Sequence, residues 1–460
     1  MQETCDTGAM MATQGRSKPG TAMLLTFRAG NVRSFRDEME LSFLATGLAE
    51  RQVVREIAWN STGATVDVLP AACIFGANAS GKSNVLRAMS DMRDAVIRSF
   101  RSWDPSGGTE RRPFRLDRES AGRPTMFEVD MVLSGVRHVY GFRLDDESIV
   151  AEWASRYPKG RPALLFRRDG MTVTWGGSVP AAKSRAVTEI LRRNALVLST
   201  AAATGHPTLT PLYEWFRRNL LLAEAESRPI RHAFSAHMLT HSETRDKVMA
   251  LLQAADLGIV GVSEEEIDPV VQERLERAVR VLNGSEDSEA PVDAGSFAMS
   301  AYRFHHAGDG VEVTFTADEE SMGTLVWLGL AGPIVDALAS GAVLLADEID
   351  TSLHPALTAQ IVRMFQDPET NPNRAQLVFN SHDTTLLGDS TGDRPLGRDQ
   401  IWFAEKRNDG ATVLFPLTDL DPRKEEAVGR RYLAGRYGGH PILAEGDFDA
   451  AAHLITAGGN

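Results

Sequence analysis

The stretch that decides the fold is Gly76-Ala77-Asn78-Ala79-Ser80-Gly81-Lys82-Ser83, which follows an apolar run at residues 68–75. Its GxxxxGKS spacing is that of a phosphate-binding loop, in which glycines let the backbone aim N–H groups at phosphate oxygens. Lys82 would reach the β- and γ-phosphates, and the Ser83 hydroxyl would hold Mg²⁺. Asn84 and the residues after it continue with helical spacing. We therefore expect ATP and Mg²⁺ between a buried strand and a helix N-terminus; a Gly/Ser surface turn is the alternative.

A second apolar strand, predicted at residues 343–346, ends in the acids Asp347 and Glu348. We expect Asp347 to hold the Mg²⁺ shell and Glu348 to polarise the attacking water as general base. A third strand, predicted at residues 376–380, is followed by Ser381-His382-Asp383. His382 could then hydrogen-bond the γ-phosphate and sense hydrolysis; an ordinary loop histidine is the alternative interpretation.

Between the two halves lies Ser321-Met322-Gly323-Thr324, directly before an apolar helix predicted at residues 322–338. Ser321 could cap that helix, and Gly323 could allow close backbone approach. The helix N-terminus could then bind a phosphate, which need not belong to the same subunit.

The hydrophobic and polar patterns divide the whole chain into five segments. We expect a disordered leader at 1–22, an ATPase lobe with the phosphate loop and an antiparallel meander at 23–203, and a mostly helical insertion at 204–295. A second ATPase lobe at 296–420 and a tail at 421–460 complete it. Within these, helices are predicted at 181–198, 211–222 and from Ser263 to about residue 282, and a linker at 283–295.

Composition limits the function. The net charge of −13 argues against a uniformly basic nucleic-acid-binding surface, yet residues 151–193 carry nine Lys/Arg against three Asp/Glu. That segment is either a basic face or a solvated surface that balances acidic residues 256–293. Two cysteines exclude a disulfide framework and favour a reducing cytoplasm, with Cys73 a core residue. No apolar run predicts a membrane span, because the longest are broken by Gly, Pro or charge.

The order of phosphate loop, insertion, Ser-x-Gly helix start, Asp-Glu strand and strand-end histidine resembles the ABC-type ATPase heads of the SMC, RecF and OLD group. This resemblance implies an α/β P-loop NTPase fold with an ABC-type head, an antiparallel β meander and a helical insertion. In those families the Ser-Gly element of one protomer completes the site of the other. The resemblance therefore implies a homodimer through the ATPase heads, with Ser321 and Gly323 acting across it.

The run from Asp347 to Pro355 resembles prokaryotic RecF/OLD-like ATPases, and the tail at 399–406, 423–425 and 432–438 is similar to the AbiLi/RloA-like abortive-infection branch of AAA/ABC-type ATPases. The resemblance extends from about Met23 to the C-terminus. It implies ATP hydrolysis in antiphage defence, coupled to a separate RloB-like or nuclease effector.

The chain departs from this pattern in two places. ABC-type heads place a glutamine after the phosphate-loop helix, but none occurs here between Lys82 and Gln253. Glu128 is the nearest polar candidate, although a solvent-facing strand residue is the simpler interpretation. The acids at 445–449 are similar to part of a TOPRIM nuclease site, but only eleven residues follow them, so we expect a polar turn.

Three functions remain open at this point. The first is an ATP-dependent dimeric sensor in phage defence. The second is a RecF-like repair ATPase that binds DNA through the basic face, which predicts steeply salt-dependent binding. The third is a protein that uses nucleotide only as a folding ligand.

Overall fold

The computed structural model describes residues 22–50, 53–223, 228–264, 302–388, 394–423 and 426–439, with the single residues 446, 449 and 453. The predicted leader lies outside the described residues except for Ala22, which begins the first strand. The linker at 283–295 and most of the acidic run at 445–449 lie outside them as well. The helix predicted from Ser263 lies outside from residue 265, and its first two residues instead end a strand.

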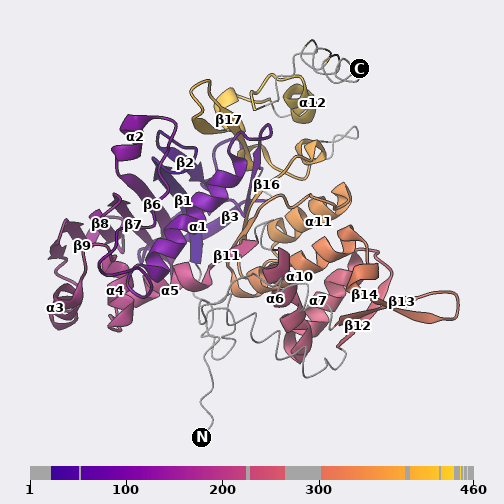
Figure 1. Ribbon diagram of the computed structural model, residues 1–460, viewed down its shortest axis with the longest axis horizontal. Coiled ribbons are helices and arrows are strands. Elements are labelled where there is room, and N and C mark those ends of the chain that lie inside the picture. Colours follow the sequence, from indigo (N-terminus) through magenta and orange to yellow (C-terminus); the bar gives the residue numbers. More distant parts are fainter. Residues whose placement is uncertain are drawn as a thin grey trace, which may run out of the picture.

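A seven-stranded antiparallel sheet forms one layer, in the order β10-β9-β8-β7-β6-β1-β2, on the left of Figure 1. The predicted meander is confirmed, since β6 to β10 each pair with the next strand in sequence. The strands are β1 (Ala22–Gly30), β2 (Met39–Ser42), β6 (Thr125–Leu133), β7 (Val136–Leu144), β8 (Ile149–Arg156), β9 (Ala163–Asp169) and β10 (Thr172–Trp175).

A six-stranded sheet in the order β11-β15-β16-β5-β17-β18 forms the central layer. All its neighbouring pairs are parallel except β17 with β18. The carboxyl ends of β5, β15 and β16 therefore meet at one edge, which is where an open parallel sheet binds its ligand. The strands are β5 (Ala71–Phe75), β11 (Leu220–Ala223), β15 (Val343–Ala346), β16 (Gln376–Asn380), β17 (Ile401–Lys406) and β18 (Thr412–Pro416).

The central sheet is covered on both faces, so its strands are continuous apolar runs. Side chains alternate between two cores: Ala72 and Ile74 of β5 face the antiparallel sheet, whereas Cys73 and Phe75 face the helices on the other side. Cys73 is fully buried, and burial raises the pKa of its thiol well above the usual value. The prediction that Cys73 is a core residue is confirmed.

Helices cover the central sheet from both sides (Figure 1). One core includes α1, α4 and α5, and the other includes α6, α7, α10, α11 and α12. The helices are α1 (Lys82–Arg98), α2 (Arg118–Gly122), α3 (Ala181–Ile190), α4 (Val197–Ala203), α5 (Thr210–Arg218), α6 (Arg228–Thr240), α7 (Ser242–Ala254), α10 (Met322–Ser340), α11 (Pro355–Gln366) and α12 (Val428–Leu433).

Two smaller sheets complete the described part. The first, in the order β12-β13-β14, packs beside α7 and leads into α10. The second is a hairpin of β3 and β4 that precedes the phosphate loop. The strands are β3 (Arg55–Ala58), β4 (Thr65–Val68), β12 (Ile259–Glu264), β13 (Tyr302–Ala307) and β14 (Glu312–Thr316), and short 3-10 turns are η2 (Ala317–Glu319), η3 (Thr384–Leu387), η4 (Arg398–Gln400) and η5 (Leu417–Leu420).

Two predicted helices differ in the structure. The helix expected over residues 181–198 is divided into α3 and α4 by a short non-helical segment, which is extended at Leu191 and at Leu196 with a turn between them. The helix expected over 211–222 ends at Arg218, because the run that follows becomes β11 and pairs with β15 in the central sheet. A short apolar run has no period that separates helix from strand, and tertiary pairing decided its structure. Within the range predicted as a helical insertion, β11 thus belongs to the central sheet.

Among the described helices, α10 has the length and apolar composition of a membrane span. Of the 18 most apolar consecutive residues of this helix, 67% are buried inside the protein. The helix packs against α6, α7, β11 and β15. Pro333 and three glycines within it explain why the sequence alone indicated no such run. Its burial is that of a core helix.

Candidate nucleotide site

The phosphate loop turns between β5 and α1 as predicted, and both outer glycines are sterically required. A Cβ on Gly76 would lie 2.4 Å from the Ala404 carbonyl oxygen. Gly81 has φ +100°, and a Cβ there would lie 2.2 Å from Thr412 Oγ1. Ala79 also takes a left-handed conformation, with φ +59°. Turns of this kind direct backbone N–H groups into one concave site, beside the N–H groups of the first turn of α1.

Residues far away in sequence hold the loop in place. Thr412 of β18 donates a hydrogen bond to the Ser80 carbonyl oxygen at 2.8 Å, and its hydroxyl lies 2.8 Å from that of Ser34. Asn84, in the first turn of α1, donates to Ser34 Oγ at 2.8 Å. Neither Ser34 nor Thr412 carries a motif, so sequence reasoning missed both.

Lys82 is buried, and its Nζ donates to the carbonyl oxygens of Gly76 and Ala77 at 2.8 and 2.9 Å. The ammonium group therefore lies across the mouth of the loop, as the motif predicts. Burial lowers the pKa of Lys82, while the carboxylates of Glu348 and Asp347 act in the opposite direction.

Asn380, the last residue of β16, joins the two predicted halves of the site. Its Nδ2 donates to Asp347 Oδ1 and, at 3.2 Å, to Ser83 Oγ. Its Oδ1 accepts a hydrogen bond from the Glu348 backbone N–H at 2.5 Å. One buried amide thus places the two predicted Mg²⁺ ligands and the predicted base. Its position at the end of the strand beside the Asp-Glu strand was the signal that could have identified it.

Glu348 and His382 both line the cleft beside the phosphate loop. Glu348 has φ +50°, a strained conformation of the kind that collects at functional sites. The His382 backbone N–H donates to Asp350 Oδ2 at 3.0 Å. Burial and then the charge of Lys82 lower the pKa of His382, so its imidazole is neutral at pH 7. The structure therefore brings together every residue predicted for the loop, the acids and the histidine.

The cleft has a volume of about 970 Å³, and its rim carries cations that sequence reasoning missed. These are Arg33, Arg87, Arg112, Arg115 and Lys406. Arg33 and Arg112 are ion-paired with Asp91, but the residues that line the cleft still carry more cations than the carboxylate of Glu348 balances, although the whole chain is acidic. Such focusing of positive charge favours a polyanionic ligand.

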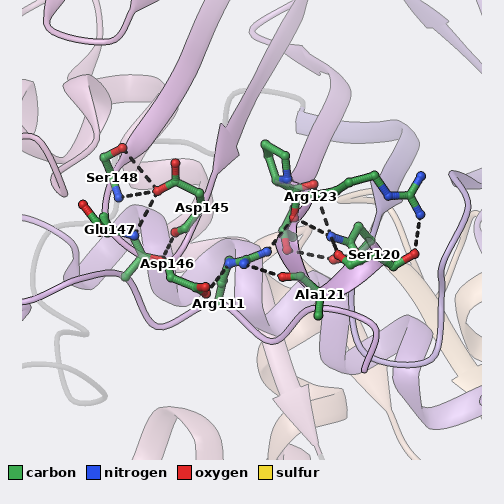
Figure 2. A network of polar contacts seen from close by, with 12 residues as sticks. Arg111, Ser120, Ala121, Arg123, Asp145, Asp146, Glu147 and Ser148 are labelled. Carbon is green, nitrogen blue, oxygen red and sulfur yellow. Dashed lines mark hydrogen bonds and ion pairs between the residues drawn. The ribbon is translucent and has the colours of Figure 1, made fainter. Parts of the chain in front are cut away.

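Residues 112–116 line the cleft, and the preceding Arg111, whose side chain is 1% exposed, holds the start of this segment in place. Figure 2 shows Arg111 between the Asp145–Ser148 turn and α2. Its guanidinium donates to Asp146 Oδ1 at 2.6 Å and to the carbonyl oxygens of Ala121 and Arg123 at 2.8 and 2.6 Å. The antiparallel sheet thereby sets the position of the next residues, which face the nucleotide cleft.

Ser321 and Gly323 lie outside this cleft of their own chain. Ser321 is the N-cap of α10 and accepts from the Thr324 backbone N–H at 3.1 Å, which confirms the predicted cap. A Cβ on Gly323 would lie 2.9 Å from the carbonyl oxygen of Ser352, so the predicted close approach is to the segment after Glu348. Ser321 and Met322 are exposed. Their proposed role across a dimer stays a prediction.

Glu128 and Arg168, which the sequence placed among the candidate residues, have structural roles. Glu128 accepts from Arg28 at 3.1 Å and from Trp153 at 2.8 Å on the antiparallel sheet, outside the cleft, so it does not replace the missing glutamine in this arrangement. Arg168, counted in the basic segment, is 1% exposed and donates to the carbonyl oxygens of Gly170 and Ala195. It is therefore unavailable to DNA.

The C-terminal segment that carried the narrower resemblance packs beneath the phosphate loop. Tyr432 stacks on Phe403 with ring centroids 5.5 Å apart, and its edge meets Phe75 at 5.9 Å. Gly439, with φ +62°, would place a Cβ 3.5 Å from the Gly76 Cα. This segment thus supports the strand that enters the loop.

The oxygen ligands at the site suit Mg²⁺, a hard cation that takes carboxylate, hydroxyl and water oxygens. Ser83 Oγ and the buried Asp347 carboxylate share Asn380 as a hydrogen-bond partner, which holds both toward the same point. Among the described residues no cluster of three His, Cys, Asp or Glu side chains forms an all-protein metal cage. The arrangement fits an ion that is held by one or two protein ligands, water and phosphate.

Residues 71–388 match the family model described as "AAA domain, putative AbiEii toxin, Type IV TA system". No curated protein matches the chain. Among solved structures, the SMC head domain from Thermotoga maritima is 12% identical, with a TM-score of 0.38, and the match covers 85% of this chain and 98% of that one.

Two further SMC heads give similar values. One is the SmcHead bound to the C-winged helix domain of ScpA, 12% identical with TM-score 0.38, covering 86% of this chain and 99% of that one. The other is the Smc head domain with an extended coiled coil bound to the C-terminal domain of ScpA, derived from Pyrococcus furiosus. It is 12% identical, with a TM-score of 0.36, and the match covers 87% of this chain and 98% of that one. Identity at this level transfers no residue role to this chain.

Proposed function

Because the chain belongs to the AAA-domain family whose model spans residues 71–388, we propose that it binds and hydrolyses ATP as a nucleotide-dependent regulator in antiphage defence. The observation that carries ATP hydrolysis is the Asn380 junction, which joins Ser83, Asp347 and Glu348 at the mouth of the phosphate loop. The family description, with its toxin and antitoxin system, supports the defence role.

Binding follows from the loop. The N–H groups of the loop and the first turn of α1 receive the phosphate oxygens, and Lys82 exchanges the carbonyl oxygens of Gly76 and Ala77 for the β- and γ-phosphates. Ser83 and Asp347 would hold Mg²⁺, which when bound neutralises the charge that develops on the phosphates. The cations of the cleft rim raise the local concentration of nucleotide.

The residues that we expect to act in hydrolysis lie at the carboxyl edge of the central sheet. Glu348 lies in the cleft with its backbone fixed by Asn380, so its carboxylate can orient a water and accept the water's proton. The neutral imidazole of His382 can donate a hydrogen bond to the γ-phosphate region. Ser321 and Gly323 do not line this cleft, which supports their use by a second copy of the chain.

We place the output in another protein. A homodimer that closes around ATP would change its surface between the bound and the hydrolysed state, and a separate effector, RloB-like or a nuclease, would respond to that change. In this proposal the effector distinguishes the ATP-bound state from the hydrolysed state, and no second active site in this chain is invoked.

Two variants test the assignment. Lys82→Ala removes the ammonium group, so we expect ATP binding to be lost in titration calorimetry, whereas the exposed Lys159→Ala should bind like the parent. Glu348→Gln keeps the shape but removes the base, so we expect ATP to bind while the hydrolysis rate falls about 10²- to 10⁴-fold. Glu189→Gln, an exposed glutamate, is the matched control. Parental turnover by Glu348→Gln would remove Glu348 as the base.

A further inference from the structure

A serine, a histidine and a glutamate form a chain of hydrogen bonds across the small sheet of β12, β13 and β14, with one residue from each strand. Ser263 Oγ lies 2.7 Å from His305 Nε2, and His305 Nδ1 lies 2.8 Å from Glu312 Oε1. None of the three lines the nucleotide cleft. Figure 1 shows the small sheet beside α7, on the other side of the molecule from the seven-stranded sheet. The proposed ATP hydrolysis therefore makes no use of these groups.

The contact with Glu312 determines which ring nitrogen of His305 carries the proton. A carboxylate only accepts hydrogen bonds, so in the neutral ring Nδ1 donates to Glu312 and Nε2 is left as an acceptor. Nε2 then accepts from the Ser263 hydroxyl, whose proton is directed at a base. A serine, an imidazole and a carboxylate in this order are the arrangement in which an imidazole activates a serine as a nucleophile.

The strand register puts a cation on the same face of the sheet as the serine. β12 and β13 are antiparallel, with Gly261 opposite His305 and Ser263 opposite Arg303. Directly opposed residues of an antiparallel pair share one face, so the Arg303 side chain belongs to the face that carries Ser263. One of its N–H groups donates to the Tyr302 carbonyl oxygen at 3.1 Å. A guanidinium on this face suits the negative oxygen that develops when a hydroxyl attacks a carbonyl group.

Gly261 leaves the imidazole open to a ligand. A Cβ on Gly261 would lie 3.7 Å from both Cγ and Cδ2 of His305, so a side chain there would rest against the ring. Its φ is not positive, so the glycine provides space rather than an unusual backbone conformation. Gly261 also lines a cleft of about 390 Å³ between α7 and β12, and the apolar residues of this cleft are Met249, Ala250, Val260 and Val262. A short acyl chain matches the size and apolar lining of this cleft.

We propose that Ser263 is a nucleophile toward carboxylic esters of short acyl chains, with His305 as its general base and Glu312 as the residue that positions the imidazole. As the bond from Ser263 Oγ to the acyl carbon forms, the hydroxyl proton passes to His305 Nε2. The ester C–O bond then breaks, and the imidazolium returns the proton to the departing alcohol. Water attacks the acyl-serine by the same route and releases the carboxylic acid. Neither step involves nucleotide, so this activity is independent of the proposed ATPase.

The test treats the full chain with a fluorophosphonate probe, which transfers its phosphonyl group to an activated serine and releases fluoride. We expect peptide mass spectrometry to locate the probe on Ser263, and the protein to hydrolyse p-nitrophenyl butyrate. Ser263→Ala should lose both reactions, and His305→Gln should slow labelling at least about 100-fold. Glu312→Gln should slow it at least about tenfold, whereas Glu312→Asp, which keeps a carboxylate, should recover part of the rate. Ser102→Ala, at an exposed serine, is the matched control and should react like the parent.

The outcomes keep this inference separate from the proposed function. Lys82→Ala should label at Ser263 like the parent, and the Ser263 and His305 variants should bind ATP like the parent, which also shows that they fold. Equal labelling rates in the parent and His305→Gln would show that the imidazole does not activate the serine, and would overturn the inference. The site mapped in the parent decides even where a variant does not fold, because a probe that is absent from Ser263 overturns the inference by itself.

Discussion

At the scale of single residues, the site depends on contacts that leave no room for a substituent. Gly76 and Gly81 are required by neighbouring atoms rather than by the motif as such, since Ala404 and Thr412 occupy the space where their Cβ atoms would be. Asn380 is a similar case, because three groups of the site depend on one amide. The chemistry is thus set by tertiary neighbours of a local motif.

The Gly81→Ala variant tests this point. The added methyl group would lie 2.2 Å from Thr412 Oγ1 at a residue with φ +100°, so we expect the loop to shift and ATP affinity to fall at least about tenfold. Gly47→Ala is the control, since its Cβ would meet no atom within 4 Å and its φ is not positive. Parental ATP affinity in Gly81→Ala, measured by calorimetry, would contradict the steric argument.

At the scale of elements, the C-terminal segment supports the phosphate loop from below. The short helix α12 brings Tyr432 onto Phe403 of β17 and against Phe75 of β5, the residue before the loop. Tyr437 stacks on the same Phe403 ring at 5.7 Å. Burial raises the pKa of Tyr432, and a hydrogen bond with the Gly76 backbone acts against that shift. The tail therefore belongs to the nucleotide site in structural terms.

Tyr432→Ala should accordingly lower both stability and ATP affinity. Removal of a ring that is 7% exposed is expected to cost about 3 kcal/mol in the free energy of unfolding, which denaturant titration would measure. Leu433→Ala, at the neighbouring position of α12 and 56% exposed, should change it by less than about 0.5 kcal/mol. Equal effects of the two substitutions would show that the aromatic stack does not hold the segment.

At the scale of the whole molecule, buried polar bridges connect layers that are far apart in sequence. Gln376 at the start of β16 donates to the carbonyl oxygens of Leu24 at 2.9 Å and Leu69 at 3.2 Å. Its Oε1 accepts from the Leu24 backbone N–H at 2.7 Å. A single buried amide thus links the antiparallel sheet to the central sheet. A second bridge joins Glu152 of β8 to the N-terminus of α4, where it accepts from the Val197 N–H at 2.6 Å.

Loss of the Gln376 bridge should weaken the attachment of the antiparallel sheet to the central sheet and destabilise the protein. Gln376→Ala would leave the buried Leu24 N–H and carbonyl oxygen without partners, so we expect the free energy of unfolding to fall by about 2–4 kcal/mol. The exposed Gln253→Ala, which loses a surface hydrogen bond of 3.2 Å, should change it by less than about 1 kcal/mol. Thermal and chemical unfolding of both variants would decide between a structural and a neutral role for Gln376.

The sequence by itself determined the phosphate loop, the Asp-Glu strand, the meander and the long helix after Ser321. Each of these follows from local physics: glycine freedom, alternation of apolar residues, or a capping hydroxyl. Other elements were predicted less well, because short apolar runs have similar patterns in helices and in strands. The run at 220–223 became β11 only because β15 offered a parallel partner. Residues 191–196 left the predicted continuous helix, with extended backbone at Leu191 and Leu196 and a turn between them.

Only the tertiary structure decided how the site is assembled. It brought Asn380, Ser34 and Thr412 to the loop from distant positions, placed the cations of residues 112–115 on the cleft rim, and turned Arg168 into the core. It also set Ser321 outside the cleft of its own chain. The physical reason is that a motif fixes the conformation of its own few residues, whereas the neighbours that hold and charge it depend on strand order and helix packing across the whole chain.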